Sequence, residues 1–266
     1  MHLGDKVIIV TGGAHGIGRA LCHRFSKEKP AGLIIGDIDI EAARDVACRT
    51  GGHALRADVS IDTDIERLVE YALSNHGRVD MFCSNAGVFL DGGLETTPAQ
   101  WQKIWKINVG AHITAARLVL PSMLARRQGC LLNTVSAAGL LTMIGSAPYT
   151  VTKHAALSFA EWLSITYADS GIHVSALCPL GVKTAMLGNG SNPVSAWMAE
   201  TAIEPEQVAE AAIAGLREKR FLILPHPEVL DFVQRKSADH ERWMAGMRRL
   251  QARVMTNHPA AAAATK

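Results

Sequence analysis

The feature that most constrains this chain is a short apolar strand that leads through a glycine-rich turn into a helix. Val7–Val10 is apolar and β-branched, which predicts a buried strand. It runs into Thr11-Gly12-Gly13-Ala14-His15-Gly16-Ile17-Gly18, and a helical pattern follows over residues 19–27. Such glycines let the backbone approach a pyrophosphate closely, while the helix N-terminus offers N–H donors and a positive dipole end. The spacing differs from the commoner G-x-G-x-x-G, so a tight turn without a ligand is the alternative.

Strand-like and helical patterns alternate along the rest of the chain. Further strands are expected at residues 33–37, 53–57, 79–83, 130–135, 174–178 and 221–224. Helices are expected at 41–49, 64–74 (with Ser60 as its N-cap), 98–127, 149–168 and 205–219, and a last helix follows Pro227. Strands separated by helices predict an α/β fold with a parallel, right-handed, doubly wound sheet. In such sheets ligands bind beyond the carboxyl ends of the strands.

Composition excludes several classes of protein. The chain has 266 residues with 27 Lys and Arg against 25 Asp and Glu, so nothing suggests nucleic acid as a partner. The five cysteines are scattered and never form CxxC, which favours a reducing compartment and leaves no zinc site. No apolar run approaches the length of a membrane span, and the early first strand leaves no room for a signal peptide. We therefore expect a cytoplasmic protein without a metal site or a membrane partner.

Tyr149 and Lys153 lie four residues apart in a predicted helix, which places phenol and ammonium on one face. A free tyrosine, with a pKa near ~10, is ionised only about one part in a thousand at neutral pH. A lysine cation at ~4 Å, in an effective dielectric near ~20, would stabilise the phenolate by roughly 4 kcal/mol, or about three pKa units. Tyr149 would then be a usable acid or base near pH 7. The alternative is a chance pair on a surface helix.

Asp37 ends the second predicted strand, about 20 residues after the glycine turn. A carboxylate at this place can accept both ribose hydroxyls of an adenosine and would repel a 2′-phosphate. Ile38 follows where an Arg would have suited a phosphate, and His15 is the one nearby group that could become cationic. These residues favour NAD over NADP. The alternative is that Asp37 merely caps the following helix.

Four further polar side chains fall at strand ends or at a helix break. Asp58 and Asn85 follow two strands at the edge where ligands bind. Ser136 follows the strand expected at 130–135, although a serine there can be a plain turn residue. Asn108-Val109-Gly110 interrupts a long helix, and such a break often marks a functional site. A solvated Asn beside a packing Gly is the alternative.

Residues 181–199 form a long Gly-, Ser- and Asn-rich segment that also carries large apolar side chains. Segments of this length often act as lids over a site, the alternative being a mobile surface excursion. No repeat or linker divides the chain, so we expect one domain over residues 1–257, with a substrate loop at 181–204, a C-terminal helix, and a frayed tail at 258–266. The C-terminal helix has an apolar stripe, expected to pack on the body or on a partner subunit, formed by Trp243, Met247, Leu250 and Val254.

Together these motifs resemble the short-chain dehydrogenase/reductase family over essentially residues 4–225. The family's glycine motif matches Thr11-Gly12-x-x-x-Gly16-x-Gly18, its adenine-contacting Asp-Val matches Asp58-Val59, and its Asn-Ala-Gly matches Asn85-Ala86-Gly87, with Ser84 where a first Asn is usual. Its Pro-Gly-x-Val-x-Thr segment corresponds to Pro179-Leu180-Gly181-Val182-Lys183-Thr184, with Leu180 in place of a glycine. The resemblance implies one Rossmann-type domain with a mostly parallel seven-stranded sheet flanked by helices on both faces, in a homotetramer or dimer.

The resemblance also implies roles for the site residues. The family's catalytic tetrad carries over onto Asn108, Ser136, Tyr149 and Lys153. Ser136 would hold the substrate oxygen, Tyr149 would exchange its proton, Lys153 would lower the Tyr149 pKa and bind the nicotinamide ribose, and Asn108 would position a relaying water. The cofactor is expected to contact Gly12, His15, Gly16, Ile17, Gly18, Asp37, Ile38, Asp58, Val59, Asn85, Ala86, Gly87, Tyr149, Lys153, Pro179, Val182 and Thr184.

The expected activity is reversible hydride transfer between NAD(H) and a secondary alcohol or ketone. A hydroxysteroid-like, aromatic or alicyclic substrate is suggested by the apolar residues Met143, Ile144, Met186, Leu187, Trp197 and Met198. No fixed cationic anchor for an acid or CoA is evident, with Lys183 and His154 left open. Two alternatives remain: an NADPH-dependent biosynthetic ketoreductase, and a cofactor-binding regulatory protein with a vestigial enzyme site.

Overall fold

A computed structural model of the protein describes residues 2–188 and 193–256. Within these ranges, the strands form one sheet in the order β3-β2-β1-β4-β5-β6-β7, and every pairing in it is parallel. The order reverses between β1 and β4, which makes the sheet doubly wound, as predicted. The strands are β1 (Val7–Thr11), β2 (Gly32–Asp37), β3 (His53–Arg56), β4 (Met81–Ser84), β5 (Gly129–Thr134), β6 (Ile172–Leu177) and β7 (Leu222–Ile223).

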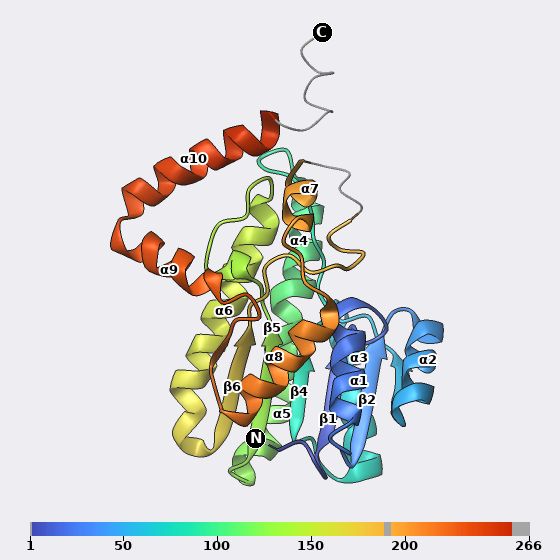
Figure 1. Cartoon of the computed structure of the whole chain (residues 1–266). Helices are drawn as coiled ribbons and strands as arrows, with labels where there is room; N and C mark the ends of the chain where they lie inside the picture. Colours follow the sequence, from blue (N-terminus) through green and yellow to red (C-terminus); the bar gives the residue numbers. More distant parts are fainter. Residues whose placement is uncertain (1, 189–192, 257–266) are drawn as a thin grey trace.

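Helices connect the strands and cover both faces of the sheet (Figure 1). The helices are α1 (Gly16–Ser26), α2 (Ile40–Thr50), α3 (Asp62–His76), α4 (Pro98–Trp105), α5 (Ala111–Ala125), α6 (Ala147–Tyr167), α7 (Pro193–Ala199), α8 (Pro205–Arg217), α9 (Glu228–Ala238) and α10 (His240–Thr256). A π-helical turn, η1 (Lys106–Gly110), joins α4 to α5, and short 3-10 turns lie at η2 (Ala137–Gly139) and η3 (Ala168–Ser170).

The sheet has a separate hydrophobic core on each face. Along β1, alternate side chains point to opposite faces: Val7 and Ile9 pack with α3, α5 and α6, whereas Ile8 and Val10 pack with α1, α2 and α8. All five residues of β1 are buried. A strand buried on both faces needs apolar residues without alternation, which is why the run Val7–Val10 could be recognised in the sequence.

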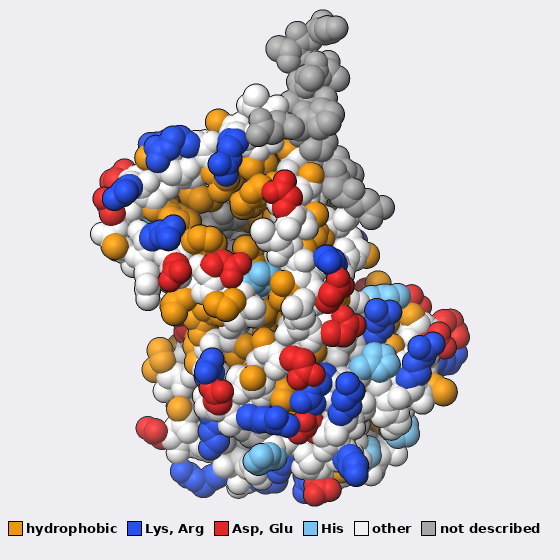
Figure 2. All heavy atoms as spheres, viewed as in Figure 1, with side chains coloured by type: hydrophobic (Ala, Val, Ile, Leu, Met, Phe, Trp, Pro, Cys, Tyr) orange, Lys and Arg blue, Asp and Glu red, His pale blue; other side chains and the backbone are white. Residues whose placement is uncertain are grey.

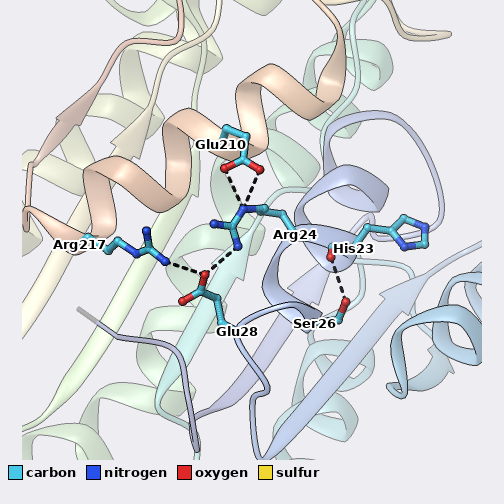
Figure 3. A network of polar contacts seen from close by, with 6 residues as sticks. All are labelled: His23, Arg24, Ser26, Glu28, Glu210 and Arg217. Carbon is cyan, nitrogen blue, oxygen red and sulfur yellow. Dashed lines mark hydrogen bonds and ion pairs between the residues drawn. The ribbon is translucent and has the colours of Figure 1, made fainter.

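Ion pairs on the surface tie α1 to α8 (Figure 3). Arg24 of α1 lies 2.8 Å from Glu210 of α8 and 2.8 Å from Glu28, and Arg217 of α8 reaches the same Glu28 carboxylate at 2.8 Å. Pairs of this kind contribute at most about 1 kcal/mol each. Their main effect is on geometry, because they hold α1, the helix that starts at the glycine turn, against α8.

Some details differ from the expectation. Ser60 does not cap α3: its hydroxyl donates to Asp58 Oδ1 at 2.7 Å, and the helix begins at Asp62. The segment 181–199 is not all loop, since it contains α7, and the expected single C-terminal helix is two, α9 and α10. The chain turns between them at Asp239, which has extended backbone angles and accepts a hydrogen bond from the Arg242 N–H at 2.9 Å. Residues 189–192 of the expected substrate loop, and the tail expected to fray at 258–266, lie outside the described residues.

Helices α9 and α10 form an arm beyond the carboxyl edge of the sheet, where α10 lies beside α7 (Figure 1). The predicted apolar stripe of α10 packs on the body of the same chain. Val254 is buried with Ile144 and Val194, and Met247 and Leu250 pack against this cluster. The arm therefore adds a wall to the edge where ligands bind.

All five cysteines are free thiols. Four are buried, and burial raises the pKa of Cys130 and of Cys178 to about 12. Cys48 on α2 is exposed. Among the described residues, no helix has the length and apolar character to cross a membrane.

Candidate active site

A cavity of about 1470 Å³ opens at the carboxyl edge of the sheet. It runs from the glycine turn, past α6 and the segment after β6, to the arm formed by α9 and α10. Every residue expected above to contact the cofactor lines this cavity, and so do the expected substrate residues Met143, Met186, Leu187 and Trp197. Of the expected tetrad, Ser136, Tyr149 and Lys153 line it, and Asn108 lies behind its wall.

The glycine turn is packed so closely that side chains would not fit in it. Gly12 has a φ of 65°, and a Cβ there would lie 2.8 Å from Ala86 Cα. A Cβ on Gly18 would overlap the Gly12 carbonyl oxygen and would lie 2.5 Å from Asn85 Nδ2. The N-cap of α1, His15, makes no side-chain cap to the helix. The first N–H groups of α1 are thus free of a competing cap, which suits the pyrophosphate of a dinucleotide.

Hydrogen bonds fix the glycine turn to the ends of β4 and β5. Asn85 Nδ2 donates to the carbonyls of Thr11 at 3.0 Å and Gly12 at 3.2 Å, and Asn85 Oδ1 accepts from Thr134 Oγ1 at 3.1 Å. Thr11 Oγ1 accepts from the N–H groups of Asn85 and Ala86. Asn85 therefore holds the floor of the cavity in place.

Asp37 and Asp39, at and just after the end of β2, contact the middle of the glycine turn at Ala14 and His15. Asp37 is buried and accepts from the Ala14 N–H at 2.9 Å and from the Asp39 N–H at 3.0 Å. Asp39, and not Asp37, caps α2 by accepting from the Ala42 N–H at 3.1 Å. The exposed His15 lies 2.9 Å from Asp39 Oδ2, and this hydrogen bond is the main reason why the pKa of Asp39 is lowered. Both Asp37 oxygens keep a lone pair for ribose hydroxyls.

Asp58 lines the cavity and is held there as a carboxylate. Its Oδ1 accepts from the Ser60 N–H at 2.9 Å and from the Ser60 hydroxyl at 2.7 Å. The hydroxyl bond is the largest cause of a lowered Asp58 pKa. The Asp58 N–H in turn donates to Asp64 Oδ2 at 2.9 Å, which fixes the loop to α3.

The helix break predicted at Asn108 is the π-helical turn η1. Asn108 is fully buried; its Oδ1 accepts from the Val88 N–H at 2.9 Å and its Nδ2 donates to Val88 O at 3.0 Å and to Thr152 Oγ1 at 3.2 Å. A Cβ on Gly87 would lie 3.3 Å from Asn108 Oδ1 and 3.6 Å from Lys153 Nζ. Asn108 thus joins the loop after β4 to α6 and brings its amide oxygen near the lysine.

Ser136 and Tyr149 both line the cavity. Ser136 follows β5 and caps the start of the turn η2, where its hydroxyl accepts a hydrogen bond from the Ala138 N–H at 3.1 Å. Tyr149 lies in the first turn of α6, which Ser146 caps by accepting from the Tyr149 N–H at 3.1 Å. The Ser136 side chain acts on the phenol of Tyr149 by lowering its pKa, and the Tyr149 ring packs edge-on against Phe89 with 5.1 Å between ring centres.

The expected lowering of the Tyr149 pKa by Lys153 is not found. Burial raises the pKa of Tyr149, and the hydrogen bond to Ser136 offsets this only in part. The Lys153 Nζ lies 5.6 Å from the centre of the Tyr149 ring and donates to Thr134 O at 3.1 Å. Burial lowers the pKa of Lys153 itself, from 10.5 to about 8. The spacing of the two residues predicted their shared face correctly, but burial is the largest cause of both pKa shifts, and Lys153 does not contribute to that of Tyr149.

The segment after β6 accepts Leu180 in place of a glycine. Among the described residues, the non-glycine positions with a positive φ are Asp5, Lys29, Arg127 and Lys219, so Leu180 is not strained. The Leu180 N–H donates to His226 Nδ1 at 3.1 Å. Thr184 lies against the glycine turn, with its Cγ2 3.0 Å from where a Gly16 Cβ would be. The segment therefore closes over the turn despite the substitution.

The arm contributes cavity residues that the sequence reasoning missed. The apolar stripe of α10 was recognised, but helical spacing does not tell whether a stripe packs on a core or borders a cavity. Figure 2 shows hydrophobic side chains around a hollow beside the arm. The additional residues on the cavity wall are Phe232, Arg235, Arg242, Trp243, Gly246, Met247, Arg249 and Leu250.

Known dehydrogenases are similar to this chain in sequence. A family model described as short chain dehydrogenase matches residues 6–194. The 1-deoxy-11-beta-hydroxypentalenate dehydrogenase of Streptomyces exfoliatus is 32% identical over 86% of this chain and 86% of its own length. The meso-2,3-butanediol dehydrogenase of Serratia marcescens is 30% identical over 79% of this chain and 86% of its own length.

A solved structure agrees with these sequence matches. A short-chain dehydrogenase/reductase from Burkholderia phymatum in complex with NAD has a TM-score of 0.82 and 27% identity, covering 91% of this chain and 96% of its own. These two relatives are dehydrogenases, and the cavity described above joins the glycine turn to a serine, a tyrosine and a lysine. The chain belongs to the short-chain dehydrogenase/reductase family and is an oxidoreductase that acts on CH–OH donors.

Proposed function

We propose that the protein catalyses reversible hydride transfer between NAD(H) and a secondary alcohol or ketone with a bulky apolar body. The observation that carries this proposal is that Ser136, Tyr149 and Lys153 line the same cavity as the glycine turn. An apolar body is supported by the walls of the cavity that Tyr149 lines, which include Met143, Met186, Leu187 and Trp197.

Within this proposal, each polar residue has one task. When bound, the nicotinamide accepts hydride from the carbinol carbon or returns it to the carbonyl carbon. Ser136 donates a hydrogen bond to the reacting oxygen, and Tyr149 exchanges the proton of that oxygen. A raised Tyr149 pKa keeps the phenol protonated at neutral pH, ready to protonate a ketone.

Lys153 is suited to pass the proton on. With a pKa of about 8 it can both hold and release a proton near neutral pH, so it can restore or remove the proton of Tyr149. Asn108 Oδ1 and Lys153 Nζ lie 3.3 Å and 3.6 Å from where a Gly87 Cβ would be. Because Oδ1 keeps a second lone pair beside its bond from the Val88 N–H, it can position a water between itself and the lysine. This relay differs from the electrostatic role first expected for Lys153. Pro179, Val182 and Thr184 would hold the nicotinamide side of the cofactor.

A phenylalanine at position 149 tests the reaction. Tyr149→Phe removes the proton donor, and we expect turnover of secondary alcohols to fall at least about 100-fold, while NADH binding measured by calorimetry stays near normal. Tyr167→Phe, near the opposite end of α6, is the matched control and should keep wild-type turnover. Retained turnover in Tyr149→Phe refutes the assignment, and failure to bind either nucleotide refutes the proposal as a whole.

NAD is preferred over NADP in this proposal because two carboxylates lie beside the adenosine ribose. Asp37 faces the cavity, and Asp39 is next to it, so a 2′-phosphate would meet negative charge. Asp37→Ala should reduce the ratio of NAD to NADP affinity about tenfold, whereas the exposed Asp45→Ala should leave it unchanged. An unaltered ratio in Asp37→Ala would overturn this role.

The NADPH-dependent ketoreductase remains a second candidate because of His15, which also lines the cavity. If protonated His15 holds a 2′-phosphate, the affinity for NADP rises as the pH falls, whereas the affinity for NAD does not. Titrating both nucleotides over a range of pH separates the two candidates.

We also propose a homo-oligomer that acts in the cytoplasm. Support comes from the outer face of α6, where Trp162 and Ile165 are 53% and 84% exposed. Light scattering on the wild type and on Ile165→Glu tests this proposal; a monomeric wild type would contradict it.

A further inference from the structure

Helix α10, the last helix of the described chain, forms one wall of the cavity. Trp243, Met247 and Leu250 recur at intervals of four and three, so they share one face of the helix, and all three line the cavity. Arg242 and Arg249 line it as well and flank this apolar face. Figure 2 shows the hydrophobic hollow with Lys or Arg side chains along the arm that borders it.

Gly246 leaves an opening in the middle of this wall. A glycine inside a helix costs about 1 kcal/mol relative to alanine, so its presence needs a reason. A Cβ on Gly246 would meet a single described atom within 4 Å, Arg249 Nη2 at 3.9 Å. The absent side chain therefore widens the cavity, and the Arg249 guanidinium lies beside the opening.

Among the described residues, the Arg249 side chain forms no ion pair and no hydrogen bond, in contrast to Arg24, Arg78 and Arg217, which contact carboxylates. The acidic residues at this end of the cavity are Asp91, Glu228 and Asp239. Asp239 Oδ1 accepts a hydrogen bond from the Arg242 N–H at 2.9 Å, and among the described residues Glu228 and Asp239 form no ion pair with Arg249. The cation beside the opening is thus left for a ligand.

We propose that this cavity takes a secondary alcohol or ketone whose apolar body carries a carboxylate or another oxyanion, and that Arg249 binds this anion. The inference rests on the proposed function and deepens it, since Tyr149 and Ser136 hold the reacting oxygen at the other end of the same substrate. A planar guanidinium suits this role because it presents two parallel N–H donors to a carboxylate. It supplies the cationic anchor that was not evident in the sequence.

Matched pairs of acid and ester test the proposal. The probes are (ω−1)-hydroxy fatty acids of increasing chain length and their methyl esters, which share a secondary alcohol and differ in charge at the far end. Trp197 and Trp243 line the cavity, so quenching of tryptophan fluorescence measures binding without turnover, and NADH formation measures turnover. We expect the wild type to prefer the acid over its ester, most strongly at the chain length that spans the cavity.

Arg249→Gln should reduce this acid preference about tenfold and leave ester binding unchanged. Arg248→Gln is the matched control, because Arg248 is the adjacent exposed arginine of α10 and does not line the cavity. Thermal unfolding should be alike in both variants, since both side chains are exposed.

The proposal is overturned if the wild type binds acid and ester equally at every chain length. Equal losses in Arg248→Gln and Arg249→Gln also overturn it, because the effect would then be the general charge of the helix. Acid-selective binding that depends on Arg249 but comes without NADH formation leaves the anion site standing and refutes the hydride transfer.

Discussion

The buried ammonium of Lys153 should destabilise the fold, and Lys153→Met should relieve that cost. Burial lowers the pKa of Lys153 from 10.5 to about 8. At about 1.4 kcal/mol per pKa unit, the charged form is disfavoured in the folded protein by about 3 kcal/mol. Methionine removes the charge at similar length but forfeits the bond from Nζ to Thr134 O, worth about 1 kcal/mol. The expected net gain at pH 7 is about 2 kcal/mol.

This gain should depend on pH in a defined direction. Below pH 8 the lysine is protonated in both the folded and the unfolded state, so the full cost is present. Between pH 8 and 10.5 the unfolded state binds more protons, and the stability of the wild type therefore rises with pH. The advantage of Lys153→Met should accordingly shrink across this window and disappear above it.

Chemical and thermal unfolding of both proteins at pH 7 and near pH 10 measure the effect. For a chain of this size, a gain of about 2 kcal/mol raises Tm by about 4–8 °C. The exposed Lys27→Met is the control and should change stability little at either pH. A Lys153→Met protein that is no more stable at pH 7, or equally favoured at both pH values, would refute the reasoning. Catalytic turnover should be lost in every case.

Three further substitutions test the local geometry. Gly18→Ala forces a Cβ onto the Gly12 carbonyl and against Asn85, so we expect a lower Tm and weaker NADH binding; wild-type affinity would contradict the tight turn. Gly246→Ala adds a methyl group to open space and should raise the free energy of unfolding by up to about 1 kcal/mol in urea titrations, where a loss would show a hidden clash. Thr97→Ala removes the capping box of α4 and should cost about 1 kcal/mol in the same titrations, with Thr97→Ser retaining most of the stability.

Local patterns were sufficient to predict the framework of the fold and the floor of the site. Val7–Val10 is uniformly apolar because β1 is covered on both faces, so its burial was already visible in the sequence. The four-residue spacing placed Tyr149 and Lys153 on one face for the same reason that any helix would. The break at Asn108 was recognisable because a mid-helix Asn-x-Gly opposes regular helix, and it is a π-helical turn.

Long-range packing decided what local patterns could not. The pKa of Tyr149 depends on how deeply the chain buries the phenol, and spacing carries no information about burial. The turn at Asp239 breaks the tail into two helices, so that Trp243 and Met247 line the cavity as well as packing against small hydrophobic clusters of the body. Arg248 and Arg249 are adjacent exposed arginines of α10, and nothing in the sequence distinguishes them. Only the tertiary structure shows that Arg249 lines the cavity and that Arg248 does not.

The distribution of thiols has a practical consequence. Deep burial keeps the Cys130 and Cys178 thiols protonated at any ordinary pH, so alkylating reagents should leave them untouched in the native protein. Cys48 is the one open thiol of the five, on a helix that packs against β2 and β3. A maleimide dye should therefore attach at a single defined point of the unmutated protein, next to the strand that ends in Asp37, and its emission could follow nucleotide binding in real time.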